Sequence, residues 1–226
     1  DYSGKIVTGW EFDHTDHPVT TPVQHFRVAG KDYIVFKDRS RIYIRDRRGS
    51  ERVPVSVTFD NSDNPLILNL DGTPKIVATD NTGKVYYIYF DGRYEQKETA
   101  VFSEDHFFTV EDLEGDGEPE FIYIDGNEVN VMKENGKRQF NRKLDNPVYN
   151  PPNIYTFSPG MKKVGVVDKE GDLIYLFNPD GNLHEGFPLQ GNSEFTIGKL
   201  SDDYEGLNLI TGSDGGKLYN YTLEPK

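Results

Sequence analysis

The sequence predicts an all-β protein, a five-bladed β-propeller in which the N-terminal strand completes the last blade. Three observations lead to this prediction. One pattern recurs five times at a spacing of about 45 residues. Each copy holds two apolar runs joined by a tight turn, and the two ends of the chain carry complementary parts of the repeat. The 226 residues include 14 Tyr, 14 Phe, 22 Gly and 13 Pro, a composition that favours strands and turns.

The central part of the repeat is an apolar run, a polar turn and a second apolar run rich in Tyr. Its first run ends in Asp or Ser at steps of 42, 45, 43 and 45 residues, at Asp38, Asp80, Asp125, Asp168 and Ser213. The turns that follow contain Gly, Asn and Asp, which tolerate positive φ and close hairpins. The two runs are therefore predicted to be the middle strands of each sheet.

Each pair of middle strands is flanked by two further apolar segments. The preceding segments begin at His25, Leu66, His106, Ile154 and Phe195. A following segment is clear in residues 52–57 and 182–189. Four strands in about 45 residues is the size of a propeller blade, and we expect residues 1–226 to form a single domain.

The two ends of the chain predict how the ring closes. Residues 5–12, KIVTGWEF, align with residues 182–189, NLHEGFPL, and the last copy ends where its outer strand is due. Residues 5–12 are therefore expected to be the outer strand of the blade that contains residues 207–223, which would remove an unpaired edge. Two alternatives are five blades of a larger ring and an open solenoid of hairpins.

The repeat resembles those of known propeller families. Its turn and its Tyr-rich strand are similar to PQQ-like and WD40-like bacterial propeller repeats, and HEGFPLQG from His184 resembles the outer strand of these and of FG-GAP or VCBS-type repeats. The resemblance implies the fold, with His184 on the outer strand, packed or solvated. Because the chain has a single Trp, at position 10, the resemblance does not imply a quinone cofactor.

An acidic loop, DLEGDGEPE from Asp112, is the candidate metal site. Oxygen ligands around a tight turn suit Ca²⁺, and the segment resembles the Ca²⁺ loop of FG-GAP and VCBS blades. The alternative is a solvated acidic turn, since residues 68–75 keep a similar turn without the other acids. The predicted ligands are Asp112, Glu114, Asp116, the carbonyl oxygen of Glu118, and Glu120.

Polar residues precede the first strand of every copy. In a propeller such residues lie at one end of the central axis, where they could converge on a polar ligand such as a sugar. His25 and His106 are interpreted as equivalent residues of two copies; the alternative is that all are solvated loop ends. The predicted ligand-binding residues are His25, Asn64, Asp105, His106, Asn153 and Glu194.

Composition limits the function classes. The net charge of −13 disfavours binding to nucleic acid, which requires clustered cations. The chain has no Cys, and no apolar run reaches the roughly 20 residues of a membrane span.

We therefore expect a non-catalytic binding or scaffolding module of a periplasmic, cell-surface or secreted protein, with a protein or carbohydrate partner. Ca²⁺ is the one cofactor expected. The alternatives are a lectin-like module, a structural spacer, and a five-bladed glycoside hydrolase. A glycosidase needs paired carboxylates, for which Asp63, Asp105 and Glu194 are candidates by position.

Overall fold

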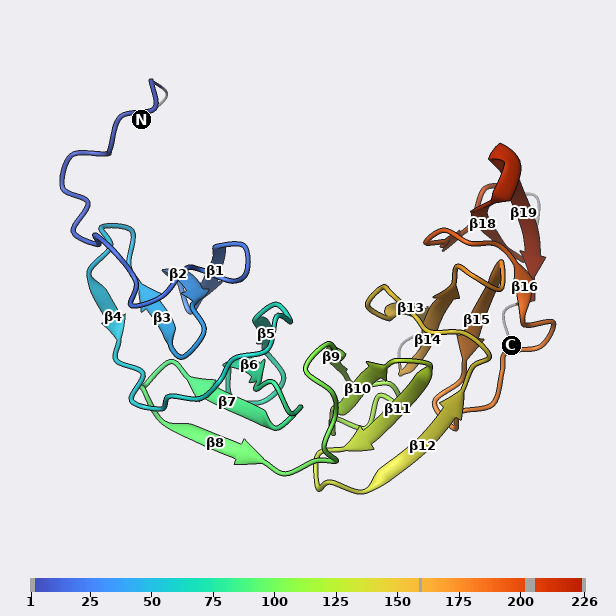
Figure 1. The fold of residues 1–226 in the computed structure, drawn as a ribbon, viewed down its shortest axis with the longest axis horizontal. Coiled ribbons are helices and arrows are strands. Elements are labelled where there is room, and N and C mark those ends of the chain that lie inside the picture. The colour runs from blue at the N-terminus through green and yellow to red at the C-terminus, as the bar shows by residue number, and fades with distance from the viewer. Residues whose placement is uncertain (1–2, 159, 202–205, 225–226) are drawn as a thin grey trace. The chain divides into compact units, whose positions relative to one another are not determined.

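The computed structural model describes residues 3–158, 160–201 and 206–224, and these are almost entirely strands and turns (Figure 1). Within them, five small antiparallel sheets follow one another along the chain. Contacts divide the chain into two units, Asp1–Asp105 and His106–Lys226, and each is described by itself. None of the described residues forms a helix long and apolar enough to cross a lipid bilayer.

The first unit holds two sheets, and strand neighbours in each follow chain order. The first sheet consists of β1 (Gln24–Val28), β2 (Lys31–Lys37), β3 (Ile42–Arg45) and β4 (Glu51–Val53). The second consists of β5 (Ile67–Asn69), β6 (Lys75–Thr79), β7 (Val85–Tyr89) and β8 (Tyr94–Lys97). Their facing side chains form one apolar core, which includes Val35, Ile44, Ile76 and Ile88.

The second unit holds three sheets. The first consists of β9 (Phe107–Glu111), β10 (Glu120–Asp125), β11 (Glu128–Lys133) and β12 (Arg138–Lys143). The next consists of β13 (Asn153–Ser158), β14 (Met161–Asp168), β15 (Leu173–Phe177) and β16 (Leu189–Gln190). The last consists of β17 (Thr196–Gly198), β18 (Leu207–Ser213) and β19 (Lys217–Leu223), with a short 3₁₀ turn, η1 (Asp214–Gly216), between β18 and β19. Each sheet packs its apolar face against the next.

The recurring Asp closes the hairpin between the middle strands, as its position predicts. The Oδ1 atom of Asp38 accepts hydrogen bonds from the backbone N–H groups of Ser40 and Arg41, at 2.8 and 2.7 Å. Asp80 accepts equivalent bonds from Thr82 and Lys84. Burial alone would raise the pKa of Asp38, but these N–H donors and others lower it below its ordinary value. The repeat thus encodes the same Asx turn in successive sheets.

The N-terminal segment differs from its prediction. Residues 5–12 form no strand in this structure, and the sheet of β17, β18 and β19 has three strands among the described residues. Ile6 and Val7 are 86% and 61% exposed. Phe12, by contrast, packs against Phe36 and Tyr43 of the first sheet, at ring-centroid distances of 5.2 and 5.7 Å. The segment is therefore held at its C-terminal end, and its apolar N-terminal residues are exposed to solvent.

Candidate functional site

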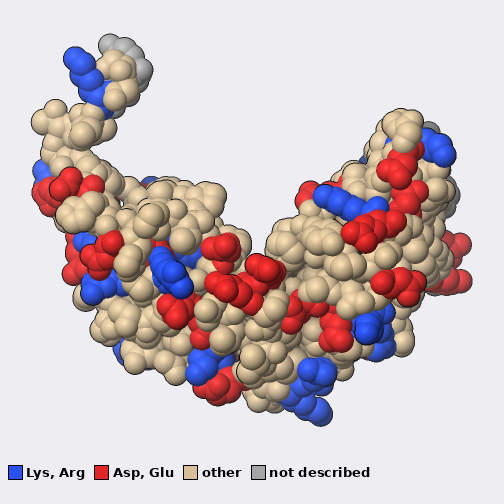
Figure 2. Space-filling view, viewed as in Figure 1, with Lys and Arg blue, Asp and Glu red and all other residues tan. Residues whose placement is uncertain are grey.

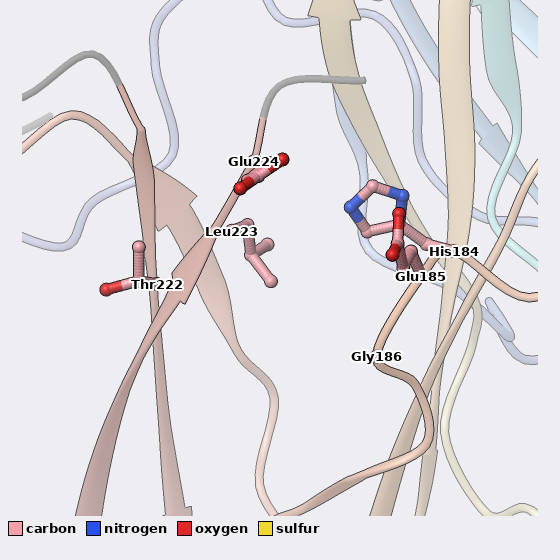
Figure 3. Close-up of a pocket in the computed structure, with 6 residues that line it drawn as sticks. All are labelled: His184, Glu185, Gly186, Thr222, Leu223 and Glu224. Carbon is pink, nitrogen blue, oxygen red and sulfur yellow. The ribbon is translucent and has the colours of Figure 1, made fainter.

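The second unit contains a groove centred on His184. A cavity of about 330 Å³ lies between the loop of residues 184–186 and the end of β19, at Thr222–Glu224. Figure 3 shows the His184 ring beside the Glu185 carboxylate, with Leu223 and Glu224 facing them from β19 and the residue that follows it. A second cavity, of about 650 Å³, shares His184 and Glu185 and extends over Lys163. We call the two cavities together the His184 groove.

Backbone hydrogen bonds fix the loop that carries His184. After β15 the chain turns at residues 178–182, and the N–H of His184 then donates to the carbonyl of Leu176 at 2.7 Å. The N–H of Phe187 donates back to the carbonyl of His184 at 3.0 Å. The imidazole packs between Phe157 and Phe187, at 5.4 and 5.8 Å between ring centroids, and His184 is 5% exposed. This histidine is therefore a buried wall of the groove.

Lys163 meets His184 from the neighbouring strand. It lies on β14 opposite Tyr155 of β13. A bulge between Thr156 and Ser158 interrupts that pairing and leaves Phe157 as the extra residue. The Nζ atom of Lys163 lies 4.4 Å from the centre of the Phe157 ring and 2.9 Å from Nδ1 of His184. Two basic side chains therefore meet at hydrogen-bond distance in an aromatic surrounding.

Burial determines the charge of this pair. Desolvation lowers the pKa of Lys163, and desolvation together with the nearby Lys163 lowers the pKa of His184. In the contact one nitrogen must donate and the other accept, so only one of the two can carry the excess proton. With the ammonium of Lys163 as donor, His184 is neutral and its proton is on Nε2.

The rim of the groove combines carboxylates with exposed aliphatic side chains. Glu114, Asp180 and Glu185 line the larger cavity, and Glu224 lines the smaller one. Met161 and Leu183 are 39% and 37% exposed beside them. Such a surface can accept a cationic group at its rim and an aliphatic group on its floor.

The acidic loop folds around its own backbone and a lysine. Both oxygens of Asp112 accept backbone N–H donors, from Gly115 at 2.6 Å and Gly117 at 2.9 Å. Asp116 accepts from the backbone N–H of Glu118 at 2.9 Å. Among the described residues, no group of three or more His, Cys, Asp or Glu side chains is placed to hold a metal ion. Calcium binding at this loop stays a prediction.

Lys133 lies at the centre of the remaining acids of this loop. Its Nζ atom is 2.5 Å from Glu114, 3.1 Å from Glu120 and 4.0 Å from Asp116. The hydrogen bonds that Lys133 donates to Glu114 and to Glu120 raise the pKa of Lys133. Glu120 is fully buried, and its other oxygen accepts the backbone N–H of Leu113 at 2.9 Å. An ammonium therefore provides positive charge where the sequence predicted Ca²⁺.

His25 and His106 are not equivalent residues, which corrects the interpretation from sequence. His25 lies within β1 opposite Ile34. In the third sheet, Phe121 is the counterpart of Ile34. The residue opposite Phe121 is Val110 and not His106. The two His residues lie near the start of a first strand in both sheets, but they differ in strand register. His25 is exposed and contacts Asp32 at 3.0 Å, whereas His106 is 3% exposed and packs near Tyr123.

The other predicted ligand-binding residues have separate surroundings. Asn64 is buried, and its backbone oxygen accepts from Lys37 at 2.5 Å. Asn153 begins β13 opposite Gly165 and is half-buried. Asp63, Asp105 and Glu194, the carboxylates of the glycosidase alternative, are exposed; the first two belong to the first unit and Glu194 to the second. That alternative and the shared pocket stay predictions.

Sequence reasoning missed the Lys163–His184 pair. The available signal was the repeat itself: Lys75, Glu120 and Lys163 occupy the same place in three copies, and all three are buried. An ionisable residue that recurs at a buried position requires a partner. The sequence does not indicate that the partner of Lys163 comes from a loop 21 residues further along the chain.

Comparisons with known proteins show similarity in fold only. No protein-family model matches the sequence, and no curated protein matches it. Among solved structures, the Vibrio cholerae biofilm matrix protein Bap1 superposes with a TM-score of 0.54 at 17% identity, over 86% of this chain. The chain spans about a third of that protein, 34% of its length.

Two further structures are similar over most of this chain. BBS1N in complex with ARL6DN gives a TM-score of 0.55 at 12% identity, covering 88% of this chain and 65% of that one. Virginiamycin B lyase from Staphylococcus aureus gives 0.52 at 14% identity, covering 94% and 73%. Both have propeller-type folds. The likeness shows an all-β arrangement of small antiparallel sheets related to propellers.

Proposed function

We propose that this chain is a non-catalytic binding module that engages a protein partner through the His184 groove. The observation that carries the proposal is the groove itself, which combines exposed Met161 and Leu183 with a carboxylate rim. An extended segment that pairs a Lys or Arg with an aliphatic residue would match both features. BBS1N, to which the chain is similar in fold, is seen in complex with a protein, ARL6DN, which is consistent with this class of partner.

The charge of the chain supports a cationic partner. The net charge of −13 attracts basic segments over a Debye length. On the face seen in Figure 2, Lys and Arg side chains are scattered among Asp and Glu. The partner's basic residues would therefore meet acids at the groove without first crossing a continuous basic surface.

Fluorescence anisotropy with labelled hexapeptides containing adjacent Lys and Leu tests the proposal. Glu185→Gln, at an exposed rim position, should weaken binding about tenfold, equivalent to about 1.4 kcal/mol. Glu51→Gln, an exposed acid of β4 in the first unit, is the matched control and should bind like the unaltered protein. Equal affinity of both variants would contradict the groove as the site. Binding to a glycan array but not to the peptides would favour the lectin-like alternative.

We further propose that the five sheets are blades of one propeller domain over residues 1–226 and that the protein works in the cell envelope or outside the cell. The first part is supported by the regular repeat and by the propeller-type structures to which the chain is similar. The second is supported by the bacterial repeat resemblance and by the likeness to a biofilm matrix protein. Fractionation of cells that produce the native protein, with immunoblotting of each fraction, tests the placement.

A further inference from the structure

The residue five positions before the recurring Asp has a consistent structural role in two sheets. The Nζ atom of Lys75 donates to the Oδ1 atom of Asn69 and the carbonyl of Asp71, both at 3.1 Å. Glu120 accepts from the N–H of Leu113. Both side chains thus bind the loop that joins the first two strands of their own sheet.

Lys163 occupies the same repeat position with a different partner. Its Nζ atom contacts an imidazole nitrogen 2.9 Å away, and Lys163 and His184 both line the cavity of about 650 Å³. The neutral form of this lysine is an amine whose lone pair can attack a carbonyl carbon, and the neutral imidazole beside it can accept the proton that the nitrogen then loses. Desolvation lowers the pKa of this lysine and so favours the neutral form.

The charged groups that face Lys163 and His184 alter the pKa of His184 but do not reverse its lowering by burial. Glu185 raises the pKa of His184, in opposition to burial and to Lys163. Glu114 and Asp180 lie on the cavity wall, and Glu114 is engaged by Lys133 at 2.5 Å. The acidic wall disfavours anionic ligands, whereas a small neutral molecule fits both the volume and the charge.

We propose that Lys163 is a reactive amine that forms an imine with a small neutral aldehyde bound in the His184 groove. The amine lone pair forms a bond to the carbonyl carbon while the carbonyl π electrons move to oxygen. His184 takes the proton that nitrogen loses and returns it to the oxygen, which gives a carbinolamine. The hydroxyl group then leaves as water with the remaining N–H proton, which His184 passes to it, and the C=N bond forms, so the step consumes no oxidant or reductant.

Glycolaldehyde with sodium cyanoborohydride at pH 7 tests the inference, because cyanoborohydride reduces the imine to a stable secondary amine. Peptide mapping by mass spectrometry then gives the labelling rate of each lysine. We expect Lys163 to react several times faster than exposed Lys31, because its lowered pKa increases the fraction of the neutral amine.

Lys37 is an internal control. It is as buried as Lys163, and desolvation lowers its pKa to about 8. Its ammonium, however, donates to the backbone oxygens of Ser62 and Asn64 at 2.6 and 2.5 Å, so we expect little labelling there. A rate for Lys163 no higher than that of Lys31 overturns the inference.

A second variant separates the role of His184 from simple exposure of the lysine. His184→Phe keeps the aromatic packing and removes the base, so labelling of Lys163 should slow at least about fivefold while that of Lys31 is unchanged. Unchanged labelling of Lys163 in this variant would also overturn the inference. The outcome is independent of peptide binding, which depends on Glu185, and either proposal can fail alone.

Discussion

Phe12 packs against Tyr43 of the first sheet, at 5.7 Å between ring centroids. Phe59 makes the corresponding contact in the next sheet, where it stacks on Tyr86 at 3.7 Å. Tyr43 and Tyr86 are equivalent residues, each following the first residue of its strand. Phe59 comes shortly after the outer strand β4. By analogy, the residues just before Phe12 lie where an outer strand ends, although they form none in this structure.

This relationship predicts that residues 5–12 add to β19, the last strand of its sheet among the described residues. In the fourth sheet, Phe177 forms a β-bridge with Leu183. Leu183 aligns with Ile6, and Tyr221 is the counterpart of Phe177 in the last sheet. Ile6 is therefore expected to lie opposite Tyr221. Because the chain has no Cys, Ile6→Cys with Tyr221→Cys should form one new disulfide on mild oxidation. Gel mobility under non-reducing conditions detects the bond. A covalent dimer would show that the strand comes from a second copy, and no cross-link would contradict the added strand.

The second prediction concerns calcium at the acidic loop. Lys133 and Ca²⁺ would compete for Glu114, Asp116 and Glu120. Addition of millimolar Ca²⁺ to chelator-treated protein should therefore raise the Tm of Lys133→Met by several degrees and that of the unaltered protein by less. Differential scanning calorimetry gives both values. Lys137→Met, in the turn after β11, is the control; equal shifts in the three proteins would contradict competition.

The contrast between Asp80 and His184 shows what the sequence could predict. The Asp recurs at fixed spacing, and its carboxylate bonds to N–H groups two and four residues away. Local structure of that kind follows from sequence alone. The His184 contact with Lys163 depends instead on a bulge at Phe157 and on a loop after β15. Neither leaves a periodic signal, so the fold was largely predictable and the groove was not.

The third prediction is a pH dependence caused by Lys37. Burial lowers its pKa from 10.5 to about 8, so between these values the unfolded chain holds a proton that the folded chain has lost. The free energy of unfolding should therefore increase with pH across this window, by up to about 3 kcal/mol.

Urea unfolding at pH 8 and pH 10.5 measures this change, and Lys37→Met should remove it. Because Tyr residues also ionise in this range, the informative quantity is the difference between the unaltered protein and each variant. Lys31→Met, at an exposed position of the same strand, should behave like the unaltered protein. The same pH increment in all three proteins would contradict a role for Lys37.

The last prediction concerns His184 at mildly acidic pH. Desolvation and the neighbouring Lys163 lower its pKa below the ordinary value of 6.5, so as the pH falls through 6.5 the unfolded chain binds a proton that the folded chain does not. Stability from this group is thus fully present above pH 6.5 and is lost as the pH falls towards the folded pKa. His184→Phe should retain more of its stability over that range, because Phe preserves packing against Phe157 and Phe187 and cannot be protonated.

Titration of the His184 ring by NMR gives the direct measurement: its midpoint should lie below 6.5 in the unaltered protein and rise in Lys163→Met, where the neighbouring positive charge is gone. A midpoint at or above 6.5 in the unaltered protein would mean that the imidazole accepts protons freely in the folded state, and the neutral Nε2–H form deduced from its contact with Lys163 would then be wrong.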